Sequence, residues 1–467
     1  MVGGHLGRTG GVAAIAAGLL VTTSWAPSFA ADLGGDCCAD LEERIAELEA
    51  TTARKGNRKL SLEVYGQINQ SIIYWDDGFE DNAYVVTNDN ARTRVGFRGK
   101  AKIDADWEAG YRIEIGIRTA NSKRFTQSNP TGNDNPNDVG LDLRDSYWYL
   151  KSKSYGAVSV GTQAAATDAI TESNLTQTRD FAKYSDVEDT GLGLYLRSSV
   201  TGDLSTLSWR RLLIDSGDQP GDGDRRQDSV KYESPTFAGF SASASWGGDD
   251  YWDAALRYAG EIGGFEVAAG IGYLQITDGP ETKHECPARG TGLSKDEDCR
   301  HLGGSVSVLH QATGLFVNVG AGRVKDDVLL TTPAFSAAAA NKPDDTSHFW
   351  AIQAGIEKKF FSLGKTTVYG EYYDYDGGGI ARSINGTSAS SPDPLNPFSS
   401  SASIFSSDVE VYGFGFAQGL DAASMVLYLS YRHVEGDLTL RQNSTGALAG
   451  VPLEDLDLVQ TGAIIKF

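Results

Sequence analysis

Among the cationic side chains between residues 92 and 144, seven stand out, and most of them follow a two-residue period. They are Arg92, Arg94, Arg98, Lys100, Arg112, Arg118 and Arg144. Successive side chains of a β-strand point to opposite faces, so in the stretch 92–103 the cations share one face, and Val95, Phe97 and Ile103 share the other. A row of guanidinium and ammonium groups attracts anions and repels cations. The pattern therefore predicts a surface that discriminates between solutes by charge.

A long stretch without a strand pattern, residues 162–191, carries six carboxylates. They are Asp168, Glu172, Asp180, Asp186, Glu188 and Asp189. A connection of this length inside a compact protein is uncommon unless it has a function. Folded toward the cationic face, its carboxylates would produce a field across a narrowed passage, which selects solutes by size, charge and dipole. The alternative is a solvated outer loop with scattered charges.

Catalytic and metal-binding patterns are not recognisable in the sequence. None of the six histidines forms a familiar spacing with a serine and an acid, so we expect no catalytic residue and no enzyme. The cysteines and histidines match no zinc pattern, so we expect no metal and no cofactor. Cys286 and Cys299 bracket a polar stretch and are predicted to form a loop disulfide, whereas the bonding of Cys37 and Cys38 stays open.

The elements that must position these charges are strands, because the hydrophobic period is two from residue 60 to the end. In the first strand Leu62, Val64 and Ile68 share one face, and Glu63 and Gln67 share the other. Eight hairpins with short turns follow, at 92–117, 141–161, 192–212, 228–246, 251–274, 302–322, 349–373 and 408–431. With an opening and a closing strand, the sequence predicts eighteen strands.

The connections indicate where the strands lie. Short turns join the two strands of each hairpin, and long polar loops join many of the hairpins to one another, which is typical of an outer-membrane β-barrel. Aromatic residues that fit interfacial belts are Trp75, Trp107, Tyr147, Tyr149, Trp246, Trp252, Phe265, Tyr273 and Trp350. The net charge of −21 makes nucleic acid a poor partner. We therefore expect an all-β transmembrane barrel over 60–467.

The region before the barrel divides into two parts. Residues 1–30 have the charged start, apolar stretch and small-residue cleavage site of a signal peptide. Residues 31–59 contain a short periplasmic helix, with Leu41, Ile45 and Leu48 on one stripe, followed by a basic linker. A helix this short is not stable alone. It either forms an axial coiled coil in a trimer, lies against its own barrel, or is frayed in the periplasm.

Several sequence runs carry a family resemblance. They are Cys37-Cys38-Ala39-Asp40-Leu41-Glu42-Glu43-Arg44, the run from Glu47 to Lys59, Thr93-Arg94-Val95-Gly96-Phe97, the turn from Pro235 to Phe240, and the terminal Phe467. With these features the mature chain resembles the alphaproteobacterial (Rhizobiales-type) outer-membrane porin family. The resemblance implies a homotrimer, passive diffusion of small hydrophilic solutes and ions, and a constriction formed by the third external loop. It also implies that Phe467 is read by the barrel-assembly machinery. General porins of this kind have sixteen strands, so the barrel has either sixteen or eighteen.

The preferred solute is less well determined by the sequence. A substrate-specific channel is the alternative to a general porin, but the aromatics placed on or near the wet faces are separated by charged positions: Tyr65, Tyr74, Trp148 and Trp209. The six loop carboxylates balance the arginines, so the constriction is expected to be nearly neutral. The acidic mouths would then confer a weak cation preference. Outer-membrane lipid and lipopolysaccharide are expected around the barrel.

Overall fold

The computed structural model describes residues 60–133, 139–214, 216–221, 226–248, 251–277, 299–327 and 341–467. The predicted signal peptide and periplasmic helix, with its Leu41, Ile45 and Leu48 stripe, lie outside the described residues. Cys299 is disulfide-bonded. Cys286 lies outside the described residues, so its pairing with Cys299 stays a prediction. In the described ranges, no helix has the length and hydropathy of a membrane span.

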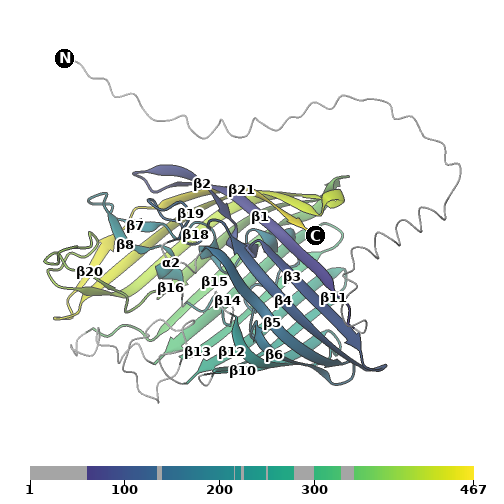
Figure 1. Ribbon diagram of the computed structural model, residues 1–467. Coiled ribbons are helices and arrows are strands. Elements are labelled where there is room, and N and C mark those ends of the chain that lie inside the picture. Colours follow the sequence, from purple (N-terminus) through teal and green to yellow (C-terminus); the bar gives the residue numbers. More distant parts are fainter. Residues whose placement is uncertain are drawn as a thin grey trace, which may run out of the picture. The chain divides into compact units, whose positions relative to one another are not determined.

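The barrel wall is a closed antiparallel sheet of sixteen strands within the described residues. In order around the wall these are β1 (Glu63–Asp76), β3 (Arg94–Lys102), β4 (Trp107–Arg118), β5 (Gly140–Ser152), β6 (Gly156–Gln163), β9 (Gln227–Glu233), β10 (Phe240–Gly247), β11 (Tyr251–Ile262), β12 (Phe265–Ile276), β13 (Cys299–His310), β14 (Leu315–Asp326), β15 (Thr346–Phe361), β16 (Gly364–Asp376), β18 (Ala402–Leu420), β19 (Met425–Gln442) and β21 (Leu456–Lys466). β21 pairs with β1, from Gln67 opposite Lys466 to Asp76 opposite Asp457, and this pairing closes the barrel (Figure 1).

The two faces of the wall differ as the sequence alternation predicts. On β1, Val64, Ile68 and Ile72 are 54 %, 48 % and 48 % exposed, whereas Asn69 and Ser71 on the other face are buried. The exposed apolar side chains form the outer face, which suits lipid, and the polar side chains form the inner face. The prediction of an all-β transmembrane barrel is therefore confirmed.

The two rims also differ. Turns of a few residues join β3 to β4, β5 to β6 and β15 to β16 at the rim that also carries Leu60 and Phe467. The opposite rim carries the long connections, including the small strands β2 (Asp81–Thr87), β17 (Ser383–Ile384) and β20 (Leu448–Pro452). In outer-membrane barrels the short turns are periplasmic and the long loops extracellular. We refer to the two ends as the turn rim and the loop rim.

The expected count of eighteen strands is wrong because one predicted hairpin lies outside the wall. Residues 192–212 form a separate sheet of β7 (Tyr195–Arg197) and β8 (Leu204–Ser208), followed by the helical turn α2 (Arg210–Leu213). The wall bypasses this segment, because β6 pairs directly with β9. The leucines that resemble lipid-facing residues, Leu194 and Leu196 among them, are instead fully buried in an apolar cluster.

Some predicted aromatic positions are also wrong. Trp75 is buried on the inner side of β1. Tyr147 lies opposite Arg112, and Tyr149 lies opposite Gly110. Directly opposed residues share a face, so both tyrosines point inward with the cations. Among the others, Trp246, Trp252, Phe265 and Trp350 are exposed as expected.

Most of the aromatics expected on wet faces do not line the lumen either. Trp148 lies between Tyr147 and Tyr149 along β5, so its side chain points to the opposite face of the strand, and it is exposed on the outer face. Tyr74 shares the outward parity of Ile72. Trp209 is buried beside α2. Of these four residues, Tyr65 alone has its side chain on the inner face of the wall, where its hydroxyl donates to Glu114 at 2.9 Å.

Candidate constriction site

The segment 162–191 crosses the inside of the barrel and is held by polar side chains of the inner wall. Near its start, the Thr167 amide and hydroxyl both donate to the Asp253 carboxylate, at 2.6 and 2.7 Å. Further along, Ser305 Oγ donates to the Ile170 carbonyl at 2.7 Å. Buried polar groups need such partners, so these contacts fix the path of the segment.

The middle of the segment contacts β15 and β16, which lie across the lumen from β6, the strand that precedes the segment. Thr178 Oγ1 donates to Gln353 Oε1 at 2.6 Å, and Gln353 Nε2 donates to the Ala182 carbonyl at 3.0 Å. The Tyr373 hydroxyl donates to the Lys183 carbonyl at 2.9 Å. The segment therefore lies across the lumen rather than outside it.

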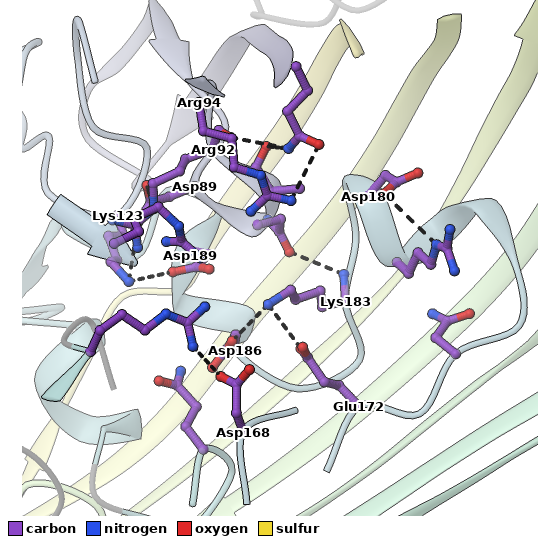
Figure 2. A pocket seen from close by; sticks show the side chains of 18 of the residues that line it. Asp89, Arg92, Arg94, Lys123, Asp168, Glu172, Asp180, Lys183, Asp186 and Asp189 are labelled. Carbon is purple, nitrogen blue, oxygen red and sulfur yellow. Dashed lines mark hydrogen bonds and ion pairs between the residues drawn. The ribbon is translucent and has the colours of Figure 1, made fainter. Parts of the chain in front are cut away.

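Between this segment and the basic wall lies a cavity of about 420 Å³. Its charged lining consists of Asp89, Arg92, Arg94, Lys123, Arg144, Asp168, Glu172, Arg179, Asp180, Lys183, Asp186, Asp189, Arg226 and Lys466. Figure 2 shows Arg92 and Arg94 on one side, with Asp168, Glu172 and Asp186 on the other. Opposite charges thus face each other across the open space.

Three of the seven predicted cations line this cavity, and carboxylates of the same wall hold them in place. Arg92 pairs with Asp142 at 3.0 Å. Arg144 and Arg94 approach Glu114, with Nε–O distances of 2.9 and 3.8 Å. The wall is therefore a network of paired charges and not a bare row of cations.

The other four predicted cations lie beside the cavity or away from it. Arg112 sits between Glu114 and Asp145, at 2.6 and 2.9 Å. Arg118 Nε pairs with Asp89 at 2.7 Å. Arg98 and Lys100 lie closer to the turn rim and are exposed, and Arg98 pairs with Glu63.

Five of the six predicted loop carboxylates line the cavity, and each has a cationic partner. The pairs are Asp168 with Arg226 at 2.8 Å, Glu172 and Asp186 with Lys183 at 3.0 and 3.2 Å, Asp180 with Lys466 at 2.6 Å, and Asp189 with Lys123 at 2.8 Å. Glu188 does not line the cavity; it is buried and accepts from Gln219 Nε2 at 2.7 Å.

The chain that carries this site matches a known protein family over most of its length. The Gram-negative porin family model matches residues 13–439, which is most of the chain. The chain belongs to the Gram-negative porin family. Its location is accordingly the outer membrane, and its strands are transmembrane strands.

Solved structures agree on the fold. An anion-selective porin from Comamonas acidovorans is similar, with a TM-score of 0.52, 15% identity, and coverage of 87% of this chain and 100% of that one. OprB of Pseudomonas putida is similar with a TM-score of 0.50, 9% identity, and coverage of 92% and 97%. At these identities the likeness concerns the fold alone. No match was found among curated proteins.

Sequence reasoning missed several cations that line the porin's cavity. Lys123 lies between β4 and β5, and Arg226 immediately precedes β9. Arg179 and Lys183 lie inside the acidic segment, and Lys466 is next to the carboxyl terminus. Only Arg179 and Lys183 had a usable signal, because they alternate with the loop carboxylates. The remaining three come from distant parts of the chain.

The lining has eight cationic side chains and six carboxylates, a formal surplus of two positive charges. Burial favours the neutral form of Glu172 and raises its pKa, with Lys183 acting in the opposite direction. Asp89 differs: burial raises its pKa, but Arg118, Arg92 and Lys123 outweigh burial and hold the pKa well below its usual range. The cavity is therefore strongly polarised and, unlike the expected neutral constriction, carries a cationic surplus.

Two groups of side chains in the described residues have ligand atoms close enough to share a metal ion. They are His433, Glu435 and Asp455 on the wall, and Asp186, Glu188 and Asp218 inside the barrel, with ligand atoms within 4.8 Å of one another. The second group overlaps the porin's cavity lining through Asp186. Carboxylate groups of this kind commonly occur without an ion, so the expectation of no metal stays a prediction.

Proposed function

We propose that the porin is a general diffusion channel, in which segment 162–191 constricts the water-filled lumen and small hydrophilic solutes and ions pass without coupling to energy. The observation that carries the proposal is the shared cavity, which Arg92, Arg94 and Arg144 line together with Asp168, Glu172 and Asp186. Arg94 begins β3 and Arg92 precedes it, Arg144 lies at the bulge of β5, and the three carboxylates lie in the inserted segment. A field between them would orient water and polar solutes.

Such a field gives selectivity without a dedicated binding pocket. Water aligned between fixed charges resists replacement by an apolar solute, so hydrocarbon-like molecules are disfavoured. A charged solute interacts with both walls at once, and the opposite effects partly cancel. The expected result is a size limit with weak charge preference.

A substrate-specific channel is the second candidate, and the lining argues against it. Sugar-specific sites need aromatic surfaces for stacking, and no residue described as lining the cavity is aromatic. A purely anion-specific site needs an unbroken cationic path, and here carboxylates alternate with cations. The general channel is therefore the better-supported function.

The proposal assigns no catalytic residue and no cofactor to the porin. The family is one of channels. The sequence offers no nucleophile with a base and an acid in a familiar spacing. Hydrolysis of phospholipid or peptide by the purified protein would contradict this part of the proposal.

The proposal also includes a homotrimer, a cleaved signal peptide at 1–30, contact with lipopolysaccharide, and recognition of Phe467 by the barrel-assembly machinery. Support for the last comes from the position of Phe467 at the closing seam. Its amide donates to the Gly66 carbonyl at 3.1 Å and its carbonyl accepts from the Gly66 amide at 2.9 Å. Loss of this residue would leave the seam incomplete at the turn rim.

The test combines planar-bilayer recordings with liposome swelling. A general channel gives a conductance linear in salt concentration, and swelling rates that fall steadily with solute size and are equal for stereoisomers. The double variant Asp168→Asn, Glu172→Gln should shift the reversal potential toward anions. The exposed loop residue Asp344 supplies the control, Asp344→Asn.

Two results would contradict the proposal. Saturation of conductance or discrimination between stereoisomers would favour the substrate-specific channel. Equal reversal potentials for the double variant and the wild type would mean that segment 162–191 does not constrict the path of ions.

A further inference from the structure

The outer face of β11–β15 carries an apolar groove of about 820 Å³. Its apolar lining includes Leu256, Ile271, Leu302, Val306, Val319 and Trp350, all between 41% and 54% exposed. These side chains belong to the face that meets lipid, and the groove is separate from the lumen. Diffusion of solutes through the lumen does not require a groove on the outer face of the barrel.

Small residues form the floor of the groove. Gly304 lies opposite Ile271 on one side and Ala321 on the other, and Ala321 lies opposite Trp350. Directly opposed residues share a face, so Gly304 and Ala321 leave a depression between the larger side chains of the neighbouring rows. Val306 and Val319 border it toward the turn rim. A depression of this shape accommodates a hydrocarbon chain.

The border toward the loop rim is cationic. Arg323 lies between Leu302 and His348 in the next row, three residues before β14 ends at Asp326. Its side chain is exposed and, within the described residues, makes no ion pair or side-chain hydrogen bond. A guanidinium on a lipid-facing wall is costly away from the interface and favourable beside an anionic headgroup. Arg323 is thus positioned for an anion at the top of the groove.

The charges around the barrel select this wall. Next to Arg323 toward the loop rim, Arg300 and Lys325 lie opposite each other on the same face, but Arg300 pairs with Asp327 at 3.6 Å and Lys325 pairs with Asp327 and Asp345, both at 3.4 Å. Along the row that contains Ala321 and Trp350, the following outward positions are all carboxylates: Asp374, Glu410 and Glu435. Of these three cations, Arg323 has no carboxylate partner within the described residues, so a phosphate is attracted to Arg323 and repelled from the carboxylates on β16–β19.

We propose that this groove binds one phosphate-bearing lipid of the outer leaflet, with an acyl chain over Gly304 and Ala321 and the phosphate against Arg323. The inference rests on the outer-membrane location of the porin and not on segment 162–191. Guanidinium–phosphate hydrogen bonds are charge-assisted and orient the headgroup. The apolar groove contributes the chain contact and excludes water.

The test uses the full-length purified porin in detergent and native mass spectrometry with added bisphosphorylated lipid A. Arg323→Gln removes the phosphate contact, and Ala321→Leu fills the groove. The matched controls are Lys359→Gln, an exposed cation at the turn rim of β15, and Ala244→Leu, an exposed outer-face alanine on β10. We expect each test variant to bind lipid A about tenfold more weakly and each control to bind like the wild type. Lipid A without phosphates should bind the wild type and Arg323→Gln equally.

Folding is checked by heat-modified mobility, and channel function by conductance of the same preparations. Unchanged binding by Arg323→Gln would overturn the phosphate contact, and unchanged binding by Ala321→Leu would overturn the groove. Dissociation of oligomers by either variant would show that the face joins copies of the chain and would also overturn the proposal. Failure of the diffusion function would change conductance while leaving lipid binding intact, so the two failures are distinguishable.

Discussion

Arg94 and Arg98 lie on the same strand and the same face but in different surroundings. Arg94 lines the cavity, whereas Arg98 lies nearer the turn rim and pairs with exposed Glu63. Arg94→Gln should increase the cation-to-anion permeability ratio, because one charge at about 4 Å in water changes the local concentration of each ion by up to roughly fivefold, in opposite directions. Arg98→Gln, the matched control, should change the ratio little. Equal effects of both substitutions on reversal potentials would contradict the assignment of the constriction.

Glu172 should make selectivity depend on pH. Burial raises the pKa of this carboxyl above its ordinary value of 4.5, because the charged form is poorly solvated. As the pH is lowered, Glu172 is protonated at a higher pH than an ordinary carboxylate. The preference for anions should therefore begin to increase while the pH is still above 4.5. At pH values above the raised folded-state pKa, ionised Glu172 lowers the free energy of unfolding. This destabilisation disappears at pH values below the unfolded-state pKa. Reversal potentials measured across pH should show this early step, and Glu172→Gln should abolish it.

Among the elements, segment 162–191 is held by polar contacts with the inner wall, and Gln353 makes two of them. Replacement by leucine removes one acceptor of the Thr178 hydroxyl and the side-chain donor to the Ala182 carbonyl, and a buried group left without a partner costs roughly 1–3 kcal/mol. Gln353→Leu should therefore loosen the segment and produce noisier single-channel currents with closure at lower voltage. Gln311→Leu, in the turn between β13 and β14 at the turn rim, is the control. Quiet currents in Gln353→Leu would show that the other contacts are sufficient.

In the whole molecule, net charge and local charge have opposite signs. The chain carries −21 overall, whereas the cavity lining has a cationic surplus. Screening lengths are about 30 Å at 0.01 M salt and about 3 Å at 1 M. Acidic mouths should give cation preference at low salt, and the constriction should give weak anion preference at high salt. Reversal potentials across this range should change sign; a constant sign would mean that one set of charges dominates throughout.

The oligomer offers a second test at this scale. Deletion of residues 32–52 removes the Leu41, Ile45 and Leu48 stripe, which lies outside the described residues. If the stripe forms an axial coiled coil, the trimers should persist but dissociate at a lower temperature on semi-native gels. Monomers would mean that contacts between barrel walls are too weak alone. An unchanged dissociation temperature would exclude the coiled coil.

Local patterns in the sequence determined the class of fold, because strand alternation is a property of adjacent residues. The parity of Val95 and Phe97 against Arg94 and Arg98 assigns both faces of β3 without any tertiary information. The rim asymmetry likewise follows from turn and loop lengths. The all-β barrel, and the inward direction of the cations, were therefore predictable.

The tertiary structure decided what local patterns leave ambiguous. The hairpin at 192–212 has the leucine pattern of a wall strand, yet β6 pairs with β9, and only that long-range pairing reduces eighteen strands to sixteen. The composition of the cavity was also not predictable from local sequence patterns, because Lys123, Arg226 and Lys466 come together with segment 162–191 only after the barrel closes. Alternation fixes which face a side chain joins. Strand pairing and loop insertion fix which residues meet.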